Sequence, residues 1–235
     1  MKPDYERGGV RLWNCDCLEL LPTLEPVAAV ITDPVWPTCP PGMLHGSDDP
    51  AGLLRASLDL IAADRVVIAL GFDCDPRFLS AVPARWPFIR SQQAPYAMPG
   101  YRGRLLGGDE VVYVFGAIPK GTGVIPGRLP TEATPKGKRD TGHPCSRSDL
   151  HTRAIVRWWT TSEDCVLDPF MGSGTTGVAC AWFGRRFLGC EIDRRYFNIA
   201  CQRIDAAIDA GALFDPTPPA IRQGGLFGTD TGRGT

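Results

Sequence analysis

Acidic residues stand at the ends of several short apolar segments, where they could accept hydrogen bonds from a polar ligand. The four positions are Asp16, Asp33, Asp168 and Glu191. If the apolar segments are neighbouring parallel strands, their carboxyl ends meet at one edge of the sheet, where ligands of open α/β sheets bind. Four acids at one edge are hard to explain as ordinary solvent-exposed residues. We therefore expect these carboxylates to line one binding site.

A glycine-rich stretch follows Asp168 and could hold a cofactor. Its sequence, Gly172-Ser173-Gly174-Thr175-Thr176-Gly177, fits the pattern G-x-G-x-x-G between a strand and a helix. Glycines let a ligand touch the backbone, and the first turn of a helix offers free N–H groups. Glu191 lies about twenty residues further on, so a nicotinamide dinucleotide site is one interpretation. Against it, Asp168 would face a pyrophosphate, and the acidic strand end at Asp33 would have no role in hydride transfer.

The elements that must position these residues alternate between strands and helices. Apolar runs predict strands over 10–13, 27–32, 65–70, 88–92, 110–115, 166–168 and 186–190. Apolar residues at helical spacing predict helices over 51–63, 76–82, 149–160, 175–183 and 194–213, and a shorter helix before Pro26. Ser148 is the expected N-cap of the third long helix, and Gly184 the C-cap of the fourth. This alternation predicts an α/β fold with a doubly wound, mostly parallel sheet.

The bulk composition fits one α/β domain. The chain has 235 residues, 43% of them hydrophobic, and no apolar run approaches the length of a membrane span. We expect one domain over residues 1–214 and a disordered Pro/Gly-rich tail over residues 215–235. Nine cysteines, odd in number and without a Cys-x-x-Cys pair, predict a reduced, cytoplasmic protein with no disulfide framework and no structural metal.

Charge is unevenly distributed along the chain. The net charge is -1, which gives no overall attraction to nucleic acid. The irregular segment over residues 116–147 and the helix after it are nevertheless rich in lysine and arginine, a pattern that suits a polyanion held at one face. On charge alone, an ordinary solvated loop is the simpler interpretation.

Several stretches together resemble the S-adenosylmethionine-dependent DNA methyltransferases that act on amino groups. Asp168-Pro-Phe-Met-Gly-Ser-Gly-Thr-Thr is similar to the cofactor loop of that family, and Asp33-Pro34-Val35-Trp36 to its catalytic D-P-P-Y/W tetrapeptide. Residues 14–17, 143–144 and 189–196 resemble further segments of the family. The catalytic tetrapeptide precedes the cofactor loop, which is the order of the family's permuted β group. The resemblance implies a Rossmann-like methyltransferase fold with permuted motif order.

The resemblance also implies how S-adenosylmethionine is held. Asp168 would pair with its ammonium group and Glu191 with both ribose hydroxyls. Asp16 would accept from the adenine amino group, although capping a turn explains this residue equally well. Ser146 or Arg147 could reach the cofactor carboxylate. The expected cofactor residues are Asp16, Cys17, His143, Ser146, Asp168, Phe170, Gly172, Ser173, Gly174, Thr175 and Glu191.

Catalysis is assigned by the same resemblance to Asp33, Pro34 and Trp36. The Asp33 carboxylate and the Pro34 carbonyl would accept hydrogen bonds from the amino group of a flipped base, on which Trp36 would stack. Val35 departs from the family pattern, where a second proline pre-sets φ. Asp at position 33 favours N6 of adenine over N4 of cytosine. A catalytically weakened DNA-binding relative, and an RNA or protein substrate, remain alternatives.

Partners are expected from the basic segment and from the tail. Double-stranded DNA would be bound by Tyr101, Arg102, Arg104, Lys120, Lys136, Lys138 and Arg139. Tyr96 is a further candidate for the recognition loop. The small recognition region suggests a short target sequence or a homodimer. In the tail, Gln223, Leu226 and Phe227 resemble the Gln-x-x-Leu-Phe peptide that docks on the replication sliding clamp.

Overall fold

A computed structural model describes residues 1–71, 73–98, 100–102, 105–133 and 147–211, with the backbone alone for 100–102 and 105–107. The strands are β1 Tyr5–Arg7, β2 Val10–Trp13, β3 Val27–Thr32, β4 Ala63–Gly71, β5 Phe88–Ala94, β6 Gly100–Arg102, β7 Leu105–Gly107, β8 Glu110–Gly116, β9 Cys165–Asp168 and β10 Arg186–Cys190. The helices are α1 Cys17–Leu20, α2 Pro50–Asp59, α3 Asp149–Trp159, α4 Thr175–Trp182 and α5 Arg194–Gly211, with 3-10 turns at Leu21–Thr23 and Pro76–Ala81.

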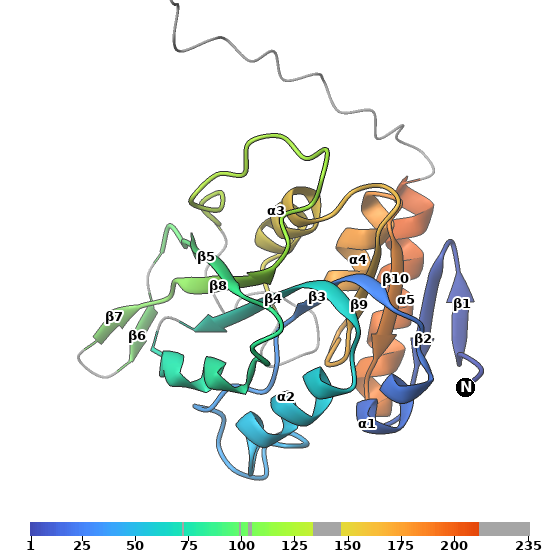
Figure 1. Ribbon diagram of the computed structural model, residues 1–235, viewed down its shortest axis with the longest axis horizontal. Helices are drawn as coiled ribbons and strands as arrows, with labels where there is room; N and C mark the ends of the chain where they lie inside the picture. The colour runs from blue at the N-terminus through green and yellow to red at the C-terminus, as the bar shows by residue number, and fades with distance from the viewer. Residues whose placement is uncertain (72, 99, 103–104, 134–146, 212–235) are drawn as a thin grey trace, which may run out of the picture.

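Eight strands form one sheet in the order β1-β2-β10-β9-β3-β4-β8-β5. The five strands from β2 to β4 are mutually parallel, and β8 and β1 run against them. β6 and β7 form a separate two-stranded ribbon, which projects from the end of the sheet opposite β1 (Figure 1). The expected mostly parallel α/β sheet is confirmed.

Helices cover both faces of this sheet, as a doubly wound fold requires. One apolar core packs α3, α4 and α5 against the sheet, and a second packs α1, α2 and the turn at Pro76–Ala81 against its other face (Figure 1). Neighbouring residues of β4 alternate between them: Val67 and Ala69 enter the first core, and Val66 and Ile68 the second. The continuous apolar runs therefore reflect strands that are buried on both sides.

Most of the predicted elements are found, with differences at their ends. Ser148 caps α3 by accepting a hydrogen bond from the backbone N–H of His151 at 3.2 Å, as expected. α2 ends at Asp59, four residues earlier than predicted, because β4 already begins at Ala63. β1 was not predicted. The sequence feature that indicates β1 is the Gly8-Gly9 pair. The φ angles of these two glycines, 57° and 81°, allow the tight turn into β2.

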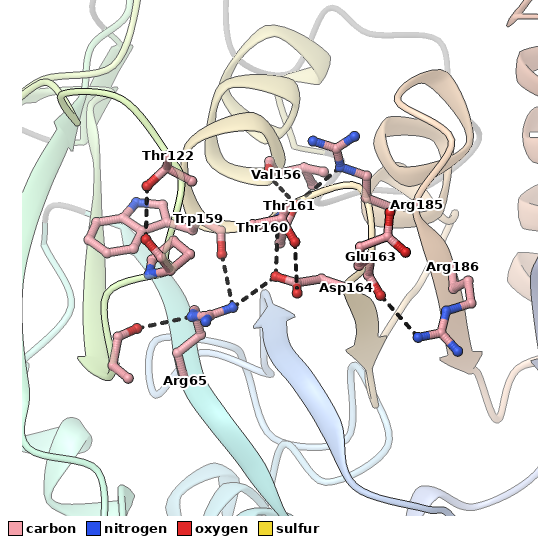
Figure 2. Close-up of polar contacts among 12 residues, drawn as sticks. Arg65, Thr122, Val156, Trp159, Thr160, Thr161, Glu163, Asp164, Arg185 and Arg186 are labelled. Carbon is pink, nitrogen blue, oxygen red and sulfur yellow. Dashed lines mark hydrogen bonds and ion pairs between the residues drawn. The ribbon is translucent and has the colours of Figure 1, made fainter.

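A buried arginine ties the start of β4 to the elements beside it. The Arg65 side chain is 6% exposed, and its Nη1 lies 3.0 Å from Oδ2 of Asp164, just before β9 (Figure 2). The same guanidinium donates to the carbonyl oxygens of Ala117 at 3.0 Å and Trp159 at 3.4 Å. None of the described helices is long and apolar enough to cross a membrane.

Replacing this arginine should destabilise the fold. Arg65→Gln leaves Asp164 largely buried without its counter-charge, and we expect the free energy of unfolding to fall by about 3 kcal/mol. Chemical denaturation measures this change. Arg77→Gln, at a side chain that is 90% exposed and pairs with Asp75, is the control and should leave the midpoint unchanged. Equal effects of the two substitutions would contradict the assignment.

Candidate active site

The candidate site lies where the direction of winding reverses in the sheet. β9 and β3 are adjacent and parallel, with Val30 opposite Leu167. From β9 the chain proceeds through α4 to β10 on one side, and from β3 through α2 to β4 on the other. Such a switch point opens a crevice beyond the carboxyl ends of the strands. Asp168 ends β9 and Asp33 follows β3 directly, so the two expected halves of the site are neighbours.

Asp168 joins these halves by hydrogen bonds. It is 2% exposed, and its Oδ1 accepts from Oγ1 of Thr32 at 2.8 Å and from the backbone N–H of Phe170 at 3.2 Å. Its Oδ2 accepts from Oγ1 of Thr176 at 2.7 Å. Burial raises the pKa of Asp168 to about 6, against the effect of these donors. Three of about four acceptor positions of the carboxylate are therefore occupied from within the chain.

The glycine loop between β9 and α4 has a backbone that only glycine adopts easily. Gly172 and Gly174 have φ angles of 52° and 79°. A Cβ on Gly174 would stand 2.8 Å from Cβ of Ala200 in α5, so the loop touches that helix directly. Arg203 of α5 holds the loop by donating to the carbonyl and hydroxyl oxygens of Ser173 at 2.7 and 3.0 Å.

Other expected cofactor residues of the glycine loop are at least partly buried. Thr175 also accepts from Arg203, at 3.2 Å. Phe170 is partly exposed and packs against the apolar core that contains α1 and α2. The loop is thus fixed by contacts on both of its sides, which leaves its backbone in one defined conformation.

Glu191 follows β10 and faces the glycine loop. Its Oε2 accepts from the backbone N–H of Gly172 at 3.0 Å, and its Oε1 from that of Asp193 at 2.8 Å. Burial raises the pKa of Glu191, while these two N–H donors act in the opposite direction. Each carboxylate oxygen retains capacity for one more donor. Glu191 can therefore bind a pair of hydroxyl groups beside the glycine loop.

Asp16 lies at the same edge, after β2, and caps α1. Its Oδ1 accepts from the backbone N–H of Leu18 at 2.9 Å, and its Oδ2 lies 3.8 Å from Nε2 of His45. The capping interpretation of Asp16 is therefore correct, and one carboxylate oxygen still faces outward. Cys17 is buried, with its Sγ 3.5 Å from Oγ of Ser57 in α2.

The tetrapeptide after β3 is an irregular segment whose two ends are joined by a side-chain hydrogen bond. Oδ1 of Asp33 accepts a hydrogen bond from Nε1 of Trp36 at 2.7 Å, and Pro34 between them is buried. The Trp36 ring lies over Gly71 at the end of β4, where a Cβ would stand 2.8 Å from Cζ3 of the ring. Val35 stands in place of the second proline, and the hydrogen bond between Asp33 and Trp36 spans this position.

Asp33 sits in a charged, mostly buried environment. Its side chain is 19% exposed, and its Oδ2 lies 3.8 Å from Nε of Arg147. Arg147 in turn places Nη2 3.3 Å from Oε2 of Glu110, a side chain that is 2% exposed. Burial raises the pKa of Asp33 to about 7; Arg147 acts against this, and the charges of Glu110 and Asp168 add to it.

Sequence reasoning missed Glu110 and misplaced Tyr96. Glu110 begins the apolar strand β8, and an acid at such a position is the signal that could have found it. Tyr96 was considered for DNA recognition. It is 6% exposed, and its hydroxyl group donates to Oε1 of Glu110 at 3.2 Å. It is therefore part of the buried polar network and does not project toward a partner.

Part of the expected DNA and cofactor contacts falls outside the described residues. Lys120 is exposed, and Tyr101 and Arg102 lie in β6, where only the backbone is described. The remaining expected residues lie outside the described ranges: Arg104, Lys136, Lys138, Arg139, His143, Ser146, Gln223, Leu226 and Phe227.

A match to the sequence model of a protein family shows which family the chain belongs to. The model of N6/N4-type DNA methylases matches residues 82–202, just over half of the sequence. The chain belongs to this DNA methylase family. The match includes the glycine loop, Glu191 and Arg147, while the tetrapeptide at Asp33 precedes it. The membership therefore rests on the cofactor half of the site.

Curated relatives of this methylase share shorter stretches with it. A type II methyltransferase, M2.DpnII of Streptococcus pneumoniae, is 41% identical over 64 residues, 27% of this chain and 24% of the relative. The DNA adenine methyltransferase YhdJ of Escherichia coli is 37% identical over 65 residues, 28% of this chain and 22% of the relative. The matches to these and similar relatives span from 22% to 54% of the relatives' length.

Solved structures match the methylase over most of its length. The M1.HpyAVI–SAM complex superposes with a TM-score of 0.66 at 25% identity, covering 83% of this chain and 99% of that one. The cytosine-N4-specific PvuII DNA methyltransferase gives a TM-score of 0.63 at 18% identity, over 90% and 94% of the two chains. The second likeness concerns the fold alone.

The raised pKa of Asp33 predicts a pH-dependent effect of its removal. In the unfolded chain the carboxyl group has its usual pKa of 3.8, and in the folded protein about 7. Its contribution to stability is therefore complete below pH 4 and is lost as pH rises through 7. Relative to Asp33→Asn, the wild type should lose roughly 2–4 kcal/mol of unfolding free energy between pH 4 and 8.

Urea denaturation of both proteins across this pH range measures the difference. The pH dependence is informative because an ion pair with Arg147 would make the wild type more stable than the variant as Asp33 ionises, whereas burial of the carboxyl group has the opposite effect. A difference that stays constant, or that changes in favour of the wild type as pH rises, would contradict the buried carboxyl assignment.

Proposed function

We propose that this chain transfers a methyl group from S-adenosylmethionine to the exocyclic amino group of a base in DNA, and that the base is adenine. The observation that carries the proposal is the adjacency of the glycine loop and the segment Asp33–Trp36 at the switch point. The hydrogen bond between Thr32 and Asp168, at 2.8 Å, joins the two. Membership in the DNA methylase family and the likeness to the M1.HpyAVI–SAM complex support it.

The donor half of the site fits S-adenosylmethionine by its chemistry. The donor supplies an electrophilic methyl group on a positively charged sulfur. Glu191 retains one free acceptor position on each oxygen for the two ribose hydroxyls, and the outward oxygen of Asp16 can accept from the adenine amino group. The backbone of Gly172–Gly174 would lie beside the methionine part. Asp168 acts mainly by fixing the loop, since Thr32, Thr176 and Phe170 already occupy most of its acceptor positions.

The acceptor half is suited to an amino group that is a poor nucleophile. The lone pair of an exocyclic amino group is delocalised into the ring of the base, so the site must favour its pyramidal form. Asp33 and the Pro34 carbonyl can accept both N–H bonds. As the C–N bond forms and the C–S bond breaks, the sulfur keeps the electron pair. Asp33 stabilises the positive charge that develops on nitrogen and takes the proton.

Adenine is favoured over cytosine by the aspartate at position 33. The relatives that align include an adenine methyltransferase, while the PvuII enzyme, which is cytosine-N4-specific, has a similar fold. The dinucleotide interpretation of the glycine stretch is disfavoured, because the match to the DNA methylase family includes this loop and hydride transfer gives no role to the acidic strand end at Asp33.

Methyl transfer to DNA tests the proposal directly. Wild-type protein should label DNA from methyl-labelled S-adenosylmethionine, and mass spectrometry of the digested nucleosides should identify N6-methyladenine. Asp33→Ala should lower the rate by about 10²–10⁴-fold, because the acceptor for the amino protons is lost. N4-methylcytosine as the product would correct the choice of base. Equal labelling by both proteins would refute the role of Asp33.

Donor binding tests the role of Glu191 separately. Glu191→Gln keeps one oxygen acceptor but loses the charge and the acceptor positions of the other oxygen, so the Kd for S-adenosylmethionine should rise by roughly tenfold. Isothermal calorimetry measures this change. Glu163→Gln, at an exposed residue before β9, is the matched control and should bind as the wild type does. If binding were unaffected in Glu191→Gln, the donor would lie elsewhere.

A further inference from the structure

We propose that Arg147 is a positioning residue for Asp33, and that Glu110 holds Arg147 in place from the opposite side. This inference rests on the proposed function, because it assigns to Arg147 the task of keeping the catalytic carboxylate charged and oriented. It also replaces the earlier expectation that Arg147 reaches for the carboxylate of the methyl donor.

The position of Arg147 in the chain fixes its backbone. Arg147 immediately precedes Ser148, whose hydroxyl group caps α3. The Ser148 side chain also donates to Oε2 of the buried Glu132. The backbone beside Arg147 is therefore held at both the helix cap and the segment next to β5, where Tyr96 bridges to Glu132. Arg147 is thus attached directly to the N-terminal cap of α3.

The guanidinium lies between two carboxylates. Its Nε is 3.8 Å from Oδ2 of Asp33 and its Nη2 is 3.3 Å from Oε2 of Glu110, and the side chain is 9% exposed. Oδ1 of Asp33 is held separately by the Trp36 indole at 2.7 Å. The two oxygens of Asp33 therefore face different partners, and this arrangement fixes the plane of the carboxylate.

Glu110 is itself fixed on its far side. Its Oε1 accepts from the Tyr96 hydroxyl at 3.2 Å. The Tyr96 ring packs edge-on against His151 of α3, with 5.0 Å between ring centroids. His151 places Nε2 3.0 Å from the carbonyl oxygen of Pro130, and burial lowers its pKa, so it is neutral at pH 7. The contacts therefore run without a break from His151 through Tyr96, Glu110 and Arg147 to Asp33.

The charges explain why this arrangement is needed. Asp33 is faced by Arg147 from the segment before α3, by Glu110 from β8 and by Asp168 from β9. Two of these three neighbours are acids, and together with burial they favour the protonated form of Asp33. Arg147 is the neighbour that favours the charged form, which is the form that can accept an amino proton.

Removing a positive charge and removing a negative charge beside Asp33 should therefore shift the pH dependence of activity in opposite directions. Removing the cation in Arg147→Gln should shift the acid limb of the pH profile of kcat/KM upward by about one unit or more. Glu110→Gln removes the competing negative charge but keeps an oxygen that can accept from Arg147, so it should shift the same limb downward. Arg147→Lys keeps the positive charge and should restore the wild-type limb in part. A purely structural role would move neither limb, and it would not give opposite signs.

The experiment measures methyl transfer by wild type and the three variants from pH 5.5 to 9, with the Kd for S-adenosylmethionine determined by calorimetry at each end. We expect donor binding to change by less than about threefold. Arg65→Gln is the matched control: it removes another buried, ion-paired guanidinium, outside the site, and should leave the acid limb in place. If Arg147→Gln does not fold, the comparison of Arg147→Lys and Glu110→Gln with wild type still gives the direction in which the acid limb shifts.

The outcomes separate this inference from the proposed function. A wild type that binds the donor but methylates no DNA would refute the proposed function. An active wild type whose acid limb is unmoved, or moved in the same direction, by Arg147→Gln and Glu110→Gln would overturn the positioning role alone. Strong loss of donor binding in Arg147→Gln with an unshifted limb would also overturn it, in favour of a contact between Arg147 and the donor carboxylate.

Discussion

The site depends on the buried carboxylate of Asp168, which links the end of β9 to the end of β3. Oxygens of this one side chain accept from Thr32, from Thr176 and from the backbone of Phe170. Because Thr32 directly precedes Asp33, the same side chain fixes the distance between the glycine loop and the segment that begins at Asp33. A carboxylate is suited to this task since it offers several acceptor positions in one plane.

Burial at this edge of the sheet has a cost for the folded protein. Burial raises the pKa of both Asp33 and Asp168, to about 7 and about 6, so ionising them opposes folding at neutral pH. The stability is supplied elsewhere, by two apolar cores and by ion pairs such as Arg65–Asp164. At this edge of the sheet the two buried acids lower the stability of the folded protein, as is typical of functional sites.

Local patterns in the sequence determined the elements and the ends of the strands. Apolar runs predicted the buried strands, Ser148 was recognised as a helix cap, and the glycine spacing located the loop before α4. Such features depend on neighbouring residues alone. Asp16, Asp33, Asp168 and Glu191 could be assigned to one edge because parallel strands bring their carboxyl ends together.

Only the tertiary structure decided which side chains meet at the site. The sequence near Glu110 does not indicate that its side chain contacts Arg147. The two residues are separated by 36 others along the chain. Asp168 was expected to face a ligand, and its donors turned out to be Thr32 and Thr176. Contacts between distant residues depend on strand order and helix packing, which a local pattern does not contain. The sequence thus placed the four acids at one edge of the sheet, and the packing decided which partners each of them contacts.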